Sequence, residues 1–157
     1  MTYDGSGNLT TITDSVGRDI TLTYDVSNRI TQITDPIGRT IQYAYDGDGN
    51  LISFTDANGG VTEFTYDSEH HILNITNPRN NIVVSNTYDS NGRVISQING
   101  RGNTTTFAYD TPDSKKTTVT DSLGFTTIHT HDNSYRLTQV MDTNGSTTVY
   151  TYDTNSN

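Results

Sequence analysis

Aspartate and tyrosine are the residues of this 157-residue chain whose spacing could support chemistry. The dipeptide Tyr-Asp recurs at Tyr3-Asp4, Tyr24-Asp25, Tyr45-Asp46, Tyr66-Asp67, Tyr88-Asp89, Tyr109-Asp110 and Tyr152-Asp153, and His131-Asp132 fills the remaining position. Carboxylates can serve as a general acid and base when two unlike environments push their pKa values apart. Here the same aspartate recurs in the same local context, which is typical of hydrogen bonds in turns. We therefore predict that these residues are structural.

The segment Asp46-Gly-Asp-Gly-Asn50 resembles the start of a calcium-binding loop, because oxygen-bearing side chains alternate with glycine. An EF-hand loop requires glycine at its sixth position and glutamate at its twelfth, where this chain has Leu51 and Ala57. The other Tyr-Asp segments carry ordinary turn residues at the same place. We expect a turn here and no bound calcium.

Four histidines are further candidates for a metal site. His70 and His71 are adjacent and would point to opposite sides of a strand, whereas His129 and His131 would share a face. Because His131 stands at a tyrosine position, we interpret the second pair as replacements within a packed row. The sequence also lacks cysteine, Gly-x-Ser-x-Gly and His-Glu-x-x-His. The prediction is a protein without enzymatic activity, with no catalytic residue, metal or cofactor.

The composition argues against several kinds of partner. Eighteen acidic against nine basic residues give a formal net charge of −9, and the basic residues cluster only at Lys115-Lys116. Nucleic acid and anionic membranes both require a positive patch, so neither is expected as a partner. No stretch approaches the roughly 20 apolar residues of a membrane-spanning helix, and this section shows no signal-peptide pattern. The hydrophobic fraction of 30% favours a thin sheet whose two faces are both partly wetted.

Successive Tyr-Asp positions are 21 or 22 residues apart, a period typical of repeat proteins whose units stack on their neighbours. The sequence predicts a single array over residues 1–157. Its units are predicted at residues 3–23, 24–44, 45–65, 66–87, 88–108, 109–130 and 131–151, with another beginning at residue 152.

Each unit also contains a turn built on a second conserved spacing. Seven residues before each tyrosine position lies a small residue, at Gly17, Gly38, Gly59, Asn81, Gly102, Gly124 and Gly145. Asn81 is the single exception to glycine, and asparagine is the residue that best tolerates positive φ after glycine. An Asp or Asn lies three or four residues earlier and can bond the backbone two residues on. The pattern predicts a turn with positive φ at the Gly or Asn81 position.

The segments between the turns are rich in Thr, Ile, Val, Tyr and Phe, which favour strands. Ile20, Leu22 and Tyr24 alternate and would share one face. The other segment of each unit has apolar residues three apart, as at Ile30 and Ile33, which fits neither a regular strand nor a helix. We expect a bulge or twist there. The predicted fold is all-β: a solenoid of tandem β-hairpins, forming a spiralling β-ribbon with almost no helix.

These features resemble the RHS, or YD-repeat, family across essentially the whole chain. The best units run from Gly49-Asn50-Leu51 through Asp56 and Gly59 to Tyr66-Asp67, and from Asn28-Arg29-Ile30 to Tyr45-Asp46. Similar proteins are bacterial polymorphic RHS and wall-associated toxins, the shell subunits of Tc toxins, and teneurins. The resemblance implies an open section of a larger hollow shell that encloses a C-terminal toxin domain, in a secreted or cell-surface protein, most often bacterial. Flanking repeats and that toxin domain would be its partners.

Three units depart from the family pattern. Residues 66–87 lack both turn glycines, residues 109–130 begin with Thr111-Pro-Asp-Ser-Lys-Lys116, and residues 131–151 begin with His131 in place of tyrosine. In the second of these, Lys116 is expected at a position that elsewhere holds Leu or Ile. No self-cleaving protease core and no toxin domain is recognisable in this section.

Two functions remain open at this stage. The first is a non-enzymatic wall of a shell that encapsulates or presents a toxin or effector. The alternative is a cell-surface adhesion or carbohydrate-binding array, in which stacked tyrosines such as Tyr43 and Tyr150 contact glycans. Cross-strand aromatic ladders are also a common way of stabilising a thin sheet. If the section exists as an isolated fragment, its unpaired outer strands favour edge-to-edge self-association.

Overall fold

The computed structural model of the chain describes residues 1–111 and 113–153. The described residues form strands and turns with no helix, which confirms the all-β prediction. The described residues contain no helix that is long and apolar enough to cross a membrane. The chain divides into two compact units, unit 1 (Met1–Ile82) and unit 2 (Val83–Asn157).

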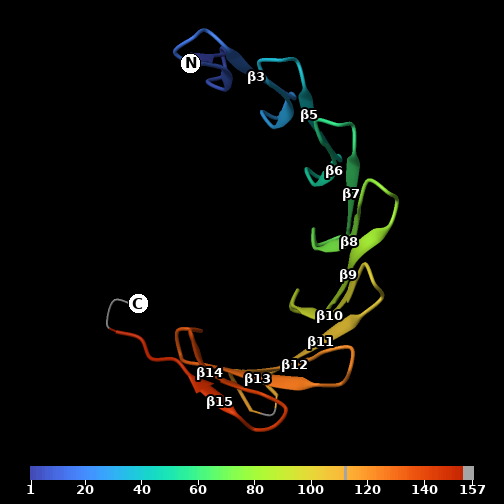
Figure 1. The fold of residues 1–157 in the computed structure, drawn as a ribbon, viewed down its shortest axis with the longest axis vertical. Helices are drawn as coiled ribbons and strands as arrows, with labels where there is room; N and C mark the ends of the chain where they lie inside the picture. Colours follow the sequence, from blue (N-terminus) through green and yellow to red (C-terminus); the bar gives the residue numbers. More distant parts are fainter. Residues whose placement is uncertain (112, 154–157) are drawn as a thin grey trace. The chain divides into compact units, whose positions relative to one another are not determined.

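Within each unit, every strand lies antiparallel to the strand that follows it in the sequence (Figure 1). Unit 1 contains β1 (Thr2–Tyr3), β2 (Leu9–Thr13), β3 (Asp19–Tyr24), β4 (Ile30–Thr34), β5 (Thr40–Tyr45), β6 (Leu51–Thr55), β7 (Val61–Tyr66) and β8 (Ile72–Thr76). Unit 2 contains β9 (Ile82–Tyr88, from its second residue on), β10 (Val94–Asn99), β11 (Thr104–Tyr109), β12 (Lys116–Thr120), β13 (Thr126–His131), β14 (Leu137–Met141) and β15 (Thr147–Val149).

The turns that contain the conserved glycine, here called glycine turns, join the strands at one end. In the turn from Asp35 to Arg39, the Asp35 N–H donates to the Arg39 carbonyl at 2.9 Å and the Gly38 N–H donates to the Asp35 carbonyl at 3.0 Å. Gly38 has a φ of 87°, a conformation that L-residues with a Cβ rarely adopt. The remaining glycines of these turns also have positive φ: Gly17, Gly59, Gly102, Gly124 and Gly145.

The positive φ expected at Asn81 lies one residue earlier, at Asn80, which has a φ of 60°. Asn81 instead closes the turn, because its carbonyl accepts from the Asn77 N–H at 2.9 Å. The displacement arises because β9 has seven residues, whereas β5 and β7 have six. Counting seven residues back from Tyr88 therefore reaches Asn81, one residue after the left-handed Asn80. The additional residue of β9 accounts for the 22-residue spacing between Tyr66 and Tyr88.

The turns that follow Tyr-Asp, here called Tyr-Asp turns, use the same hydrogen bonds at the other end of the strands. Their left-handed position is the fourth of the turn, occupied by Gly7, Asn28, Gly49, His70, Gly92 and Tyr135. His70 and His71 thus lie in a turn, and the expectation that they face opposite sides of a strand is wrong.

The bulge predicted from the three-residue spacing is confirmed. Tyr24 of β3 pairs with Ile30 of β4, but Thr23 pairs with Gln32, so Thr31 is an extra residue in β4. The extra residue restores the phase of the strand, and Ile30 and Ile33 therefore point to the same side. The same shift occurs opposite Tyr3, Tyr45, Tyr66, Tyr88 and His131.

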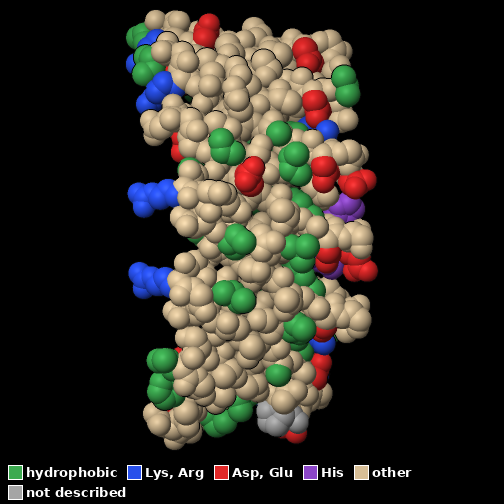
Figure 2. Space-filling model, turned by 90° about the vertical axis from the view of Figure 1, so that its right-hand side faces the viewer, with side chains coloured by type: hydrophobic (Ala, Val, Ile, Leu, Met, Phe, Trp, Pro, Cys, Tyr) green, Lys and Arg blue, Asp and Glu red, His purple; other side chains and the backbone are tan. Residues whose placement is uncertain are grey.

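The sheet is one layer thick and has no buried core. None of the described residues is fully buried. Hydrophobic side chains are visible at the surface on the face that Figure 2 shows. One face of unit 1 carries the Ile, Leu and aromatic residues, as in the pair Tyr43–Phe54, whose ring centroids are 5.6 Å apart. The opposite face carries Thr and Gln, for example Gln42, whose amide donates to Gln32 at 3.3 Å.

Candidate functional site

The aspartate of each Tyr-Asp turn organises the turn around itself. Asp25 Oδ1 accepts from the backbone N–H of Ser27 at 2.8 Å and of Arg29 at 2.9 Å, and Asp25 Oδ2 accepts from Arg29 Nε at 2.7 Å. The same double acceptance by Oδ1 recurs at Asp4, Asp46, Asp67, Asp89 and Asp132, and in the glycine turns at Asp14, Asp35, Asp56, Asn77, Asn99, Asp121 and Asp142.

Hydrogen bonding lowers the pKa of eight of these carboxyl groups, Asp4, Asp14, Asp25, Asp35, Asp46, Asp67, Asp89 and Asp132. The Arg29 backbone N–H is the largest cause that lowers the pKa of Asp25, and partial desolvation opposes it. At Asp35 desolvation is the largest single influence, yet the hydrogen bonds from Arg39 and Ile37 prevail and the pKa is lowered. A carboxylate with a lowered pKa and several fixed donors is suited to hold a turn rather than to donate a proton.

Five tyrosines of the Tyr-Asp pairs, Tyr24, Tyr45, Tyr66, Tyr109 and Tyr152, each close the open end of a hairpin through the hydroxyl group. Tyr45 Oη donates to the Ile30 carbonyl at 2.9 Å, from the end of β5 to the start of β4. The acceptor always lies fifteen residues earlier, as in the bonds from Tyr24 to Leu9, Tyr66 to Leu51, Tyr109 to Val94 and Tyr152 to Leu137. Desolvation, with the charge of Asp46 as a smaller cause, raises the pKa of Tyr66 and so keeps its hydroxyl protonated as a donor.

Arginine at the end of a Tyr-Asp turn covers the tyrosine of the next unit. The guanidinium carbon of Arg29 lies 4.4 Å from the ring centroid of Tyr45, the same distance separates Arg93 from Tyr109, and Arg136 lies 4.8 Å from Tyr152. Each arginine therefore bonds the aspartate of its own turn and stacks on the following tyrosine, which is a favourable cation–π geometry.

The unit that begins at Tyr109 breaks this pattern. Tyr109 pairs with Thr117 and Ala108 with Thr118, so β12 has no bulge and the connection from β11 is longer than a Tyr-Asp turn. Asp110 has a φ of 53°, and among the residues that the structure describes its Oδ1 accepts only from the Lys115 N–H, at 3.0 Å. The sequence analysis expected Lys116 at the position that elsewhere holds Leu or Ile, and this expectation is wrong. Thr117 takes that position, and Lys116 pairs with Thr130 on the opposite face.

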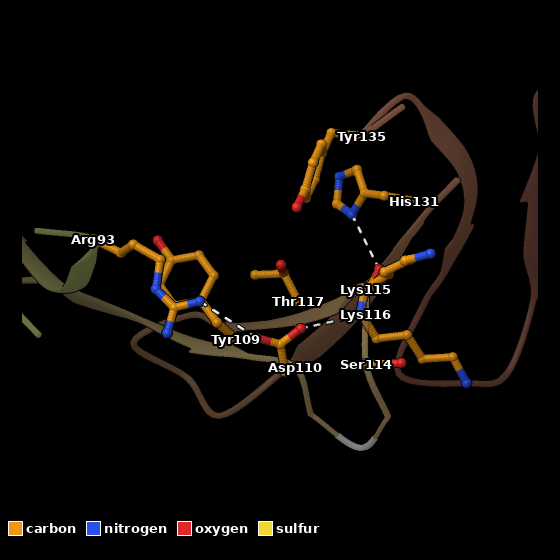
Figure 3. Close-up of a pocket in the computed structure, with 9 residues that line it drawn as sticks. All are labelled: Arg93, Tyr109, Asp110, Ser114, Lys115, Lys116, Thr117, His131 and Tyr135. Carbon is orange, nitrogen blue, oxygen red and sulfur yellow. Dashed lines mark hydrogen bonds and ion pairs between the residues drawn. The ribbon is translucent and has the colours of Figure 1, made fainter. Parts of the chain in front are cut away.

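His131 has no hydroxyl group and contacts a different carbonyl from the one that a tyrosine bonds in the regular repeats. Its Nδ1 lies 3.3 Å from the Lys115 carbonyl oxygen, and its backbone N–H donates to the same oxygen at 2.9 Å. A hollow of about 570 Å³ lies beside it in unit 2, between Tyr109, Thr117, His131 and Tyr135 (Figure 3). The sequence singled out His131 and placed Lys116 where Thr117 lies, and it gave no sign that Thr117 and Tyr135 would border a common space.

The candidate cation sites are used for other contacts. Asp46 binds the amide groups of Asp48 and Asn50 within its own turn. His70 Nδ1 lies 2.7 Å from Asn50 Oδ1, and His71 Nδ1 lies 2.9 Å from Asp67 Oδ2, in the place of the usual arginine. Among residues 1–111 and 113–153, no group of three or more His, Cys, Asp or Glu is arranged to hold a metal ion.

The fold and its repeated Tyr-Asp turns define a class of protein built from β-hairpin repeats of the YD type. The family model described as Teneurin YD-shell matches residues 1–126. The chain belongs to this YD-shell family. No curated protein gives a significant match.

Solved structures with the same fold come from Tc toxins. The Tc holotoxin pore of Photorhabdus luminescens is 20% identical with a TM-score of 0.69, over 97% of this chain and 9% of that chain. The crystal structure of TcdB2-TccC3 is 20% identical with a TM-score of 0.70, over 97% of this chain and 10% of that chain. The form without the hypervariable C-terminal region is 21% identical with a TM-score of 0.69, over 99% and 10%. The chain thus spans about a tenth of the length of the chains that it matches.

Proposed function

We propose that this chain is a wall segment of a YD-repeat shell that encloses or presents a C-terminal toxin or effector domain in a larger secreted or cell-surface protein. The segment carries no catalytic group of its own in this proposal. Its partners are the repeats that flank it and the enclosed domain. Membership of the YD-shell family and the fold shared with Tc toxin subunits support this function.

The observation that carries the proposal is that the recurring aspartates, tyrosines and arginines of the regular repeats hold the sheet together. The aspartates accept the turn amides, the tyrosine hydroxyls close the hairpins, and the arginines join one unit to the next. A one-layer sheet without buried residues gains little stability from a core, so these polar contacts must hold its shape. Such a sheet can cover a large area with few residues, as a container wall requires.

The test is limited proteolysis of the longer protein that contains this section. We expect the domain that follows the repeats to resist a protease that rapidly digests the same domain when it is expressed alone. A variant with Ile33→Asp and Phe64→Asp, which charges the apolar face, should open the wall and expose the domain. As a control, Thr21→Asp and Thr65→Asp place the same charges on the polar face. Equal digestion rates in the native and opened forms would contradict encapsulation.

A further inference from the structure

We propose that the hollow in unit 2 is a binding site for an aromatic carboxylate, a flat ring that carries a single negative charge. The inference goes beyond the wall function and does not depend on it. It rests on the side chains that are missing from the hollow, on the rings that border it and on the charged groups that line it.

The hollow lies where the regular repeats hold a tyrosine ring and an aliphatic side chain. In unit 1 the Tyr45 hydroxyl reaches the Ile30 carbonyl, and Ile30 pairs with Tyr24. In the repeat that begins at Tyr109, His131 takes the place of Tyr45 and Thr117 takes the place of Ile30. The hollow beside these smaller residues, about 570 Å³, is within the range of small-molecule sites, about 300–1,000 Å³. An aromatic ligand would replace the ring that this repeat lacks.

Two tyrosine rings border the hollow (Figure 3). Tyr109 is held in place, because its hydroxyl donates to the Val94 carbonyl at 2.8 Å and the Arg93 guanidinium carbon lies 4.4 Å from its ring centroid. Tyr135 is 83% exposed and has a φ of 61°, at a turn position that holds Gly or Asn in most other Tyr-Asp turns. A bulky ring kept in a strained conformation is consistent with a role in binding, and aromatic pairs attract one another beyond the area they bury.

A hydroxyl group on the ligand ring would have a partner in His131. Nδ1 of His131 lies 3.3 Å from the Lys115 carbonyl oxygen, and Nδ1 must be the donor because a carbonyl can only accept. In the neutral imidazole the other nitrogen, Nε2, is then an acceptor. Figure 3 shows Nε2 on the side of the ring that faces Tyr135. A phenol can therefore donate to Nε2, much as the tyrosine of a regular repeat donates to a carbonyl.

The charged groups that line the hollow favour an anion. They are three cations and one carboxylate: Arg93, Lys115, Lys116 and Asp110. Arg93 also bonds Asp89 at 2.8 Å, and Lys116 bonds Asp113 at 2.7 Å. Among the described residues that line the hollow, neither Asp89 nor Asp113 is present. The surface that a ligand would contact therefore has an excess of positive charge, which a ligand with one carboxylate would complement.

Lys115 is the cation that we assign to the ligand's carboxylate. Its ammonium donates to the uncharged side chain of Asn133. Among the residues that the structure describes, Arg93 and Lys116 have carboxylate partners and Lys115 has none. An ion pair with Lys115 would thus form without the loss of an existing one. At an exposed site such a pair is worth up to about fivefold in affinity.

The test is a titration of the 157-residue chain with para-hydroxyphenylacetate, followed through amide chemical shifts. We expect saturable shifts centred on Tyr109, Thr117 and His131. The neutral amide of the same compound should bind about fivefold more weakly, because it cannot form the ion pair. Acetate and glucuronate, which carry the charge without an aromatic ring, should produce no saturable shift. Tighter binding of N-acetyltyrosine than of the free acid would identify the end of a peptide as the source of the ligand, and the reverse order a free aromatic acid.

Three variants test the parts of the site separately. Lys115→Gln should weaken binding of the acid about fivefold and leave that of the neutral amide within about twofold. Tyr135→Asn should weaken both about tenfold without unfolding the chain, because Asn28 occupies the same turn position. The double variant Thr117→Leu and His131→Tyr, which refills the space, should abolish binding of both.

Arg18→Gln is the matched control for the loss of a cation, because the Arg18 side chain is 68% exposed and lies in unit 1. Its affinity for the acid should stay within about twofold of the native value. Three results would overturn the proposal: no saturable shift with the aromatic acid, full affinity in the refilled variant, or equal affinity for the acid and its neutral amide. Because none of these experiments involves an enclosed domain, their failure leaves the wall function untouched.

Discussion

Unit 1 and unit 2 contain the same repeat in a regular and an interrupted form. In unit 1 every turn spans five residues, and each aspartate or Asn77 accepts two amides through Oδ1. In unit 2 the connection after Tyr109 is longer, its strand pair has no bulge, and the next tyrosine is replaced by His131. Because these changes occur next to one another in unit 2, we infer that they are linked.

The link is the phase of the strand after the turn. A five-residue turn followed by a bulge places a Leu, Ile or Val carbonyl where the next tyrosine hydroxyl can reach it. Without the bulge, the residue opposite Tyr109 is Thr117, and the strand no longer offers the same acceptor. At position 131 the side chain instead contacts the Lys115 carbonyl, through Nδ1 of His131 at 3.3 Å.

Acid should produce the largest difference between the units. Six carboxyls with a lowered pKa lie in unit 1 (Asp4, Asp14, Asp25, Asp35, Asp46, Asp67) and two in unit 2 (Asp89, Asp132). A folded-state pKa below the ordinary value of 3.8 gives stability that is present above that pH and lost as the pH falls through the lowered pKa. Hydrogen exchange between about pH 4 and pH 2 should show that strands β2–β7 lose protection before β10–β14.

The variant Asp25→Asn is the control for this acid effect. Asn77 shows that an amide oxygen accepts the same two backbone donors, at 3.0 and 3.1 Å. The variant should keep the turn between β3 and β4 but lose its titration, so that protection there becomes less sensitive to acid. Equal acid sensitivity of both units would mean that the turn carboxylates do not govern it.

Truncation of the side chain that lies beside the tyrosine should lower the free energy of unfolding more in unit 1 than in unit 2. Ile30→Ala should lower the free energy of unfolding by about 1.5 kcal/mol, below the range for fully buried sites because Ile30 is half-buried. Thr117→Ala should cost no more than about 0.5 kcal/mol, since the hollow already lies beside it. Urea denaturation followed by circular dichroism measures both. A cost for Thr117→Ala as large as that for Ile30→Ala would contradict a hollow at this site.

The tyrosine hydroxyl should contribute a smaller and separable amount. Tyr45→Phe removes only the bond to the Ile30 carbonyl and should cost about 1 kcal/mol of unfolding free energy. His131→Phe is the matched change in the interrupted unit. It should be close to neutral, because it adds apolar area and removes only the long contact of Nδ1 with the Lys115 carbonyl, which the His131 backbone N–H also bonds. If Tyr45→Phe were also neutral, the hydroxyl ladder would have no part in stability.

The smallest effect concerns the left-handed turn position. Tyr135→Gly should raise the free energy of unfolding by about 0.5 kcal/mol, because glycine adopts a φ of 61° without strain. Asn28→Gly, at the same position of a regular turn, should change it by less than about 0.3 kcal/mol, since asparagine already tolerates this conformation. A destabilised Tyr135→Gly variant would instead assign the ring a structural role.

The sequence predicted the parts of the fold that recur with a fixed local spacing. The Tyr-Asp period gave the hairpin array, and the three-residue spacing of Ile30 and Ile33 indicated the bulge that the strand register shows. The bond from the Tyr45 hydroxyl to the Ile30 carbonyl was not predicted, although the structure repeats the same separation of fifteen residues in other repeats. A hydroxyl-to-carbonyl contact leaves no trace in residue type at the acceptor, because every residue has a carbonyl.

The repeat that begins at Tyr109 was harder to predict, because strand register decides on which face each of its side chains lies. Counting positions placed Lys116 in the apolar row, whereas the loss of one bulge moves Thr117 there. The same kind of error placed the left-handed residue at Asn81 rather than at Asn80. A single added residue reverses which side chains share a face, and pattern alone does not reveal whether a turn or a strand absorbs it.

The fifteen-residue separation of the tyrosine bond has a consequence for how such genes change length. Donor and acceptor lie within one repeat period of each other, so copying or deleting a 21-residue block leaves every remaining tyrosine with an acceptor of the correct type. Unequal recombination between repeats would thus yield longer or shorter proteins that need no compensating mutation. An insertion or deletion of one residue within a turn has no such freedom, because it alters the register of the strand that follows. Arrays of this kind are therefore expected to evolve more readily in repeat number than in loop length.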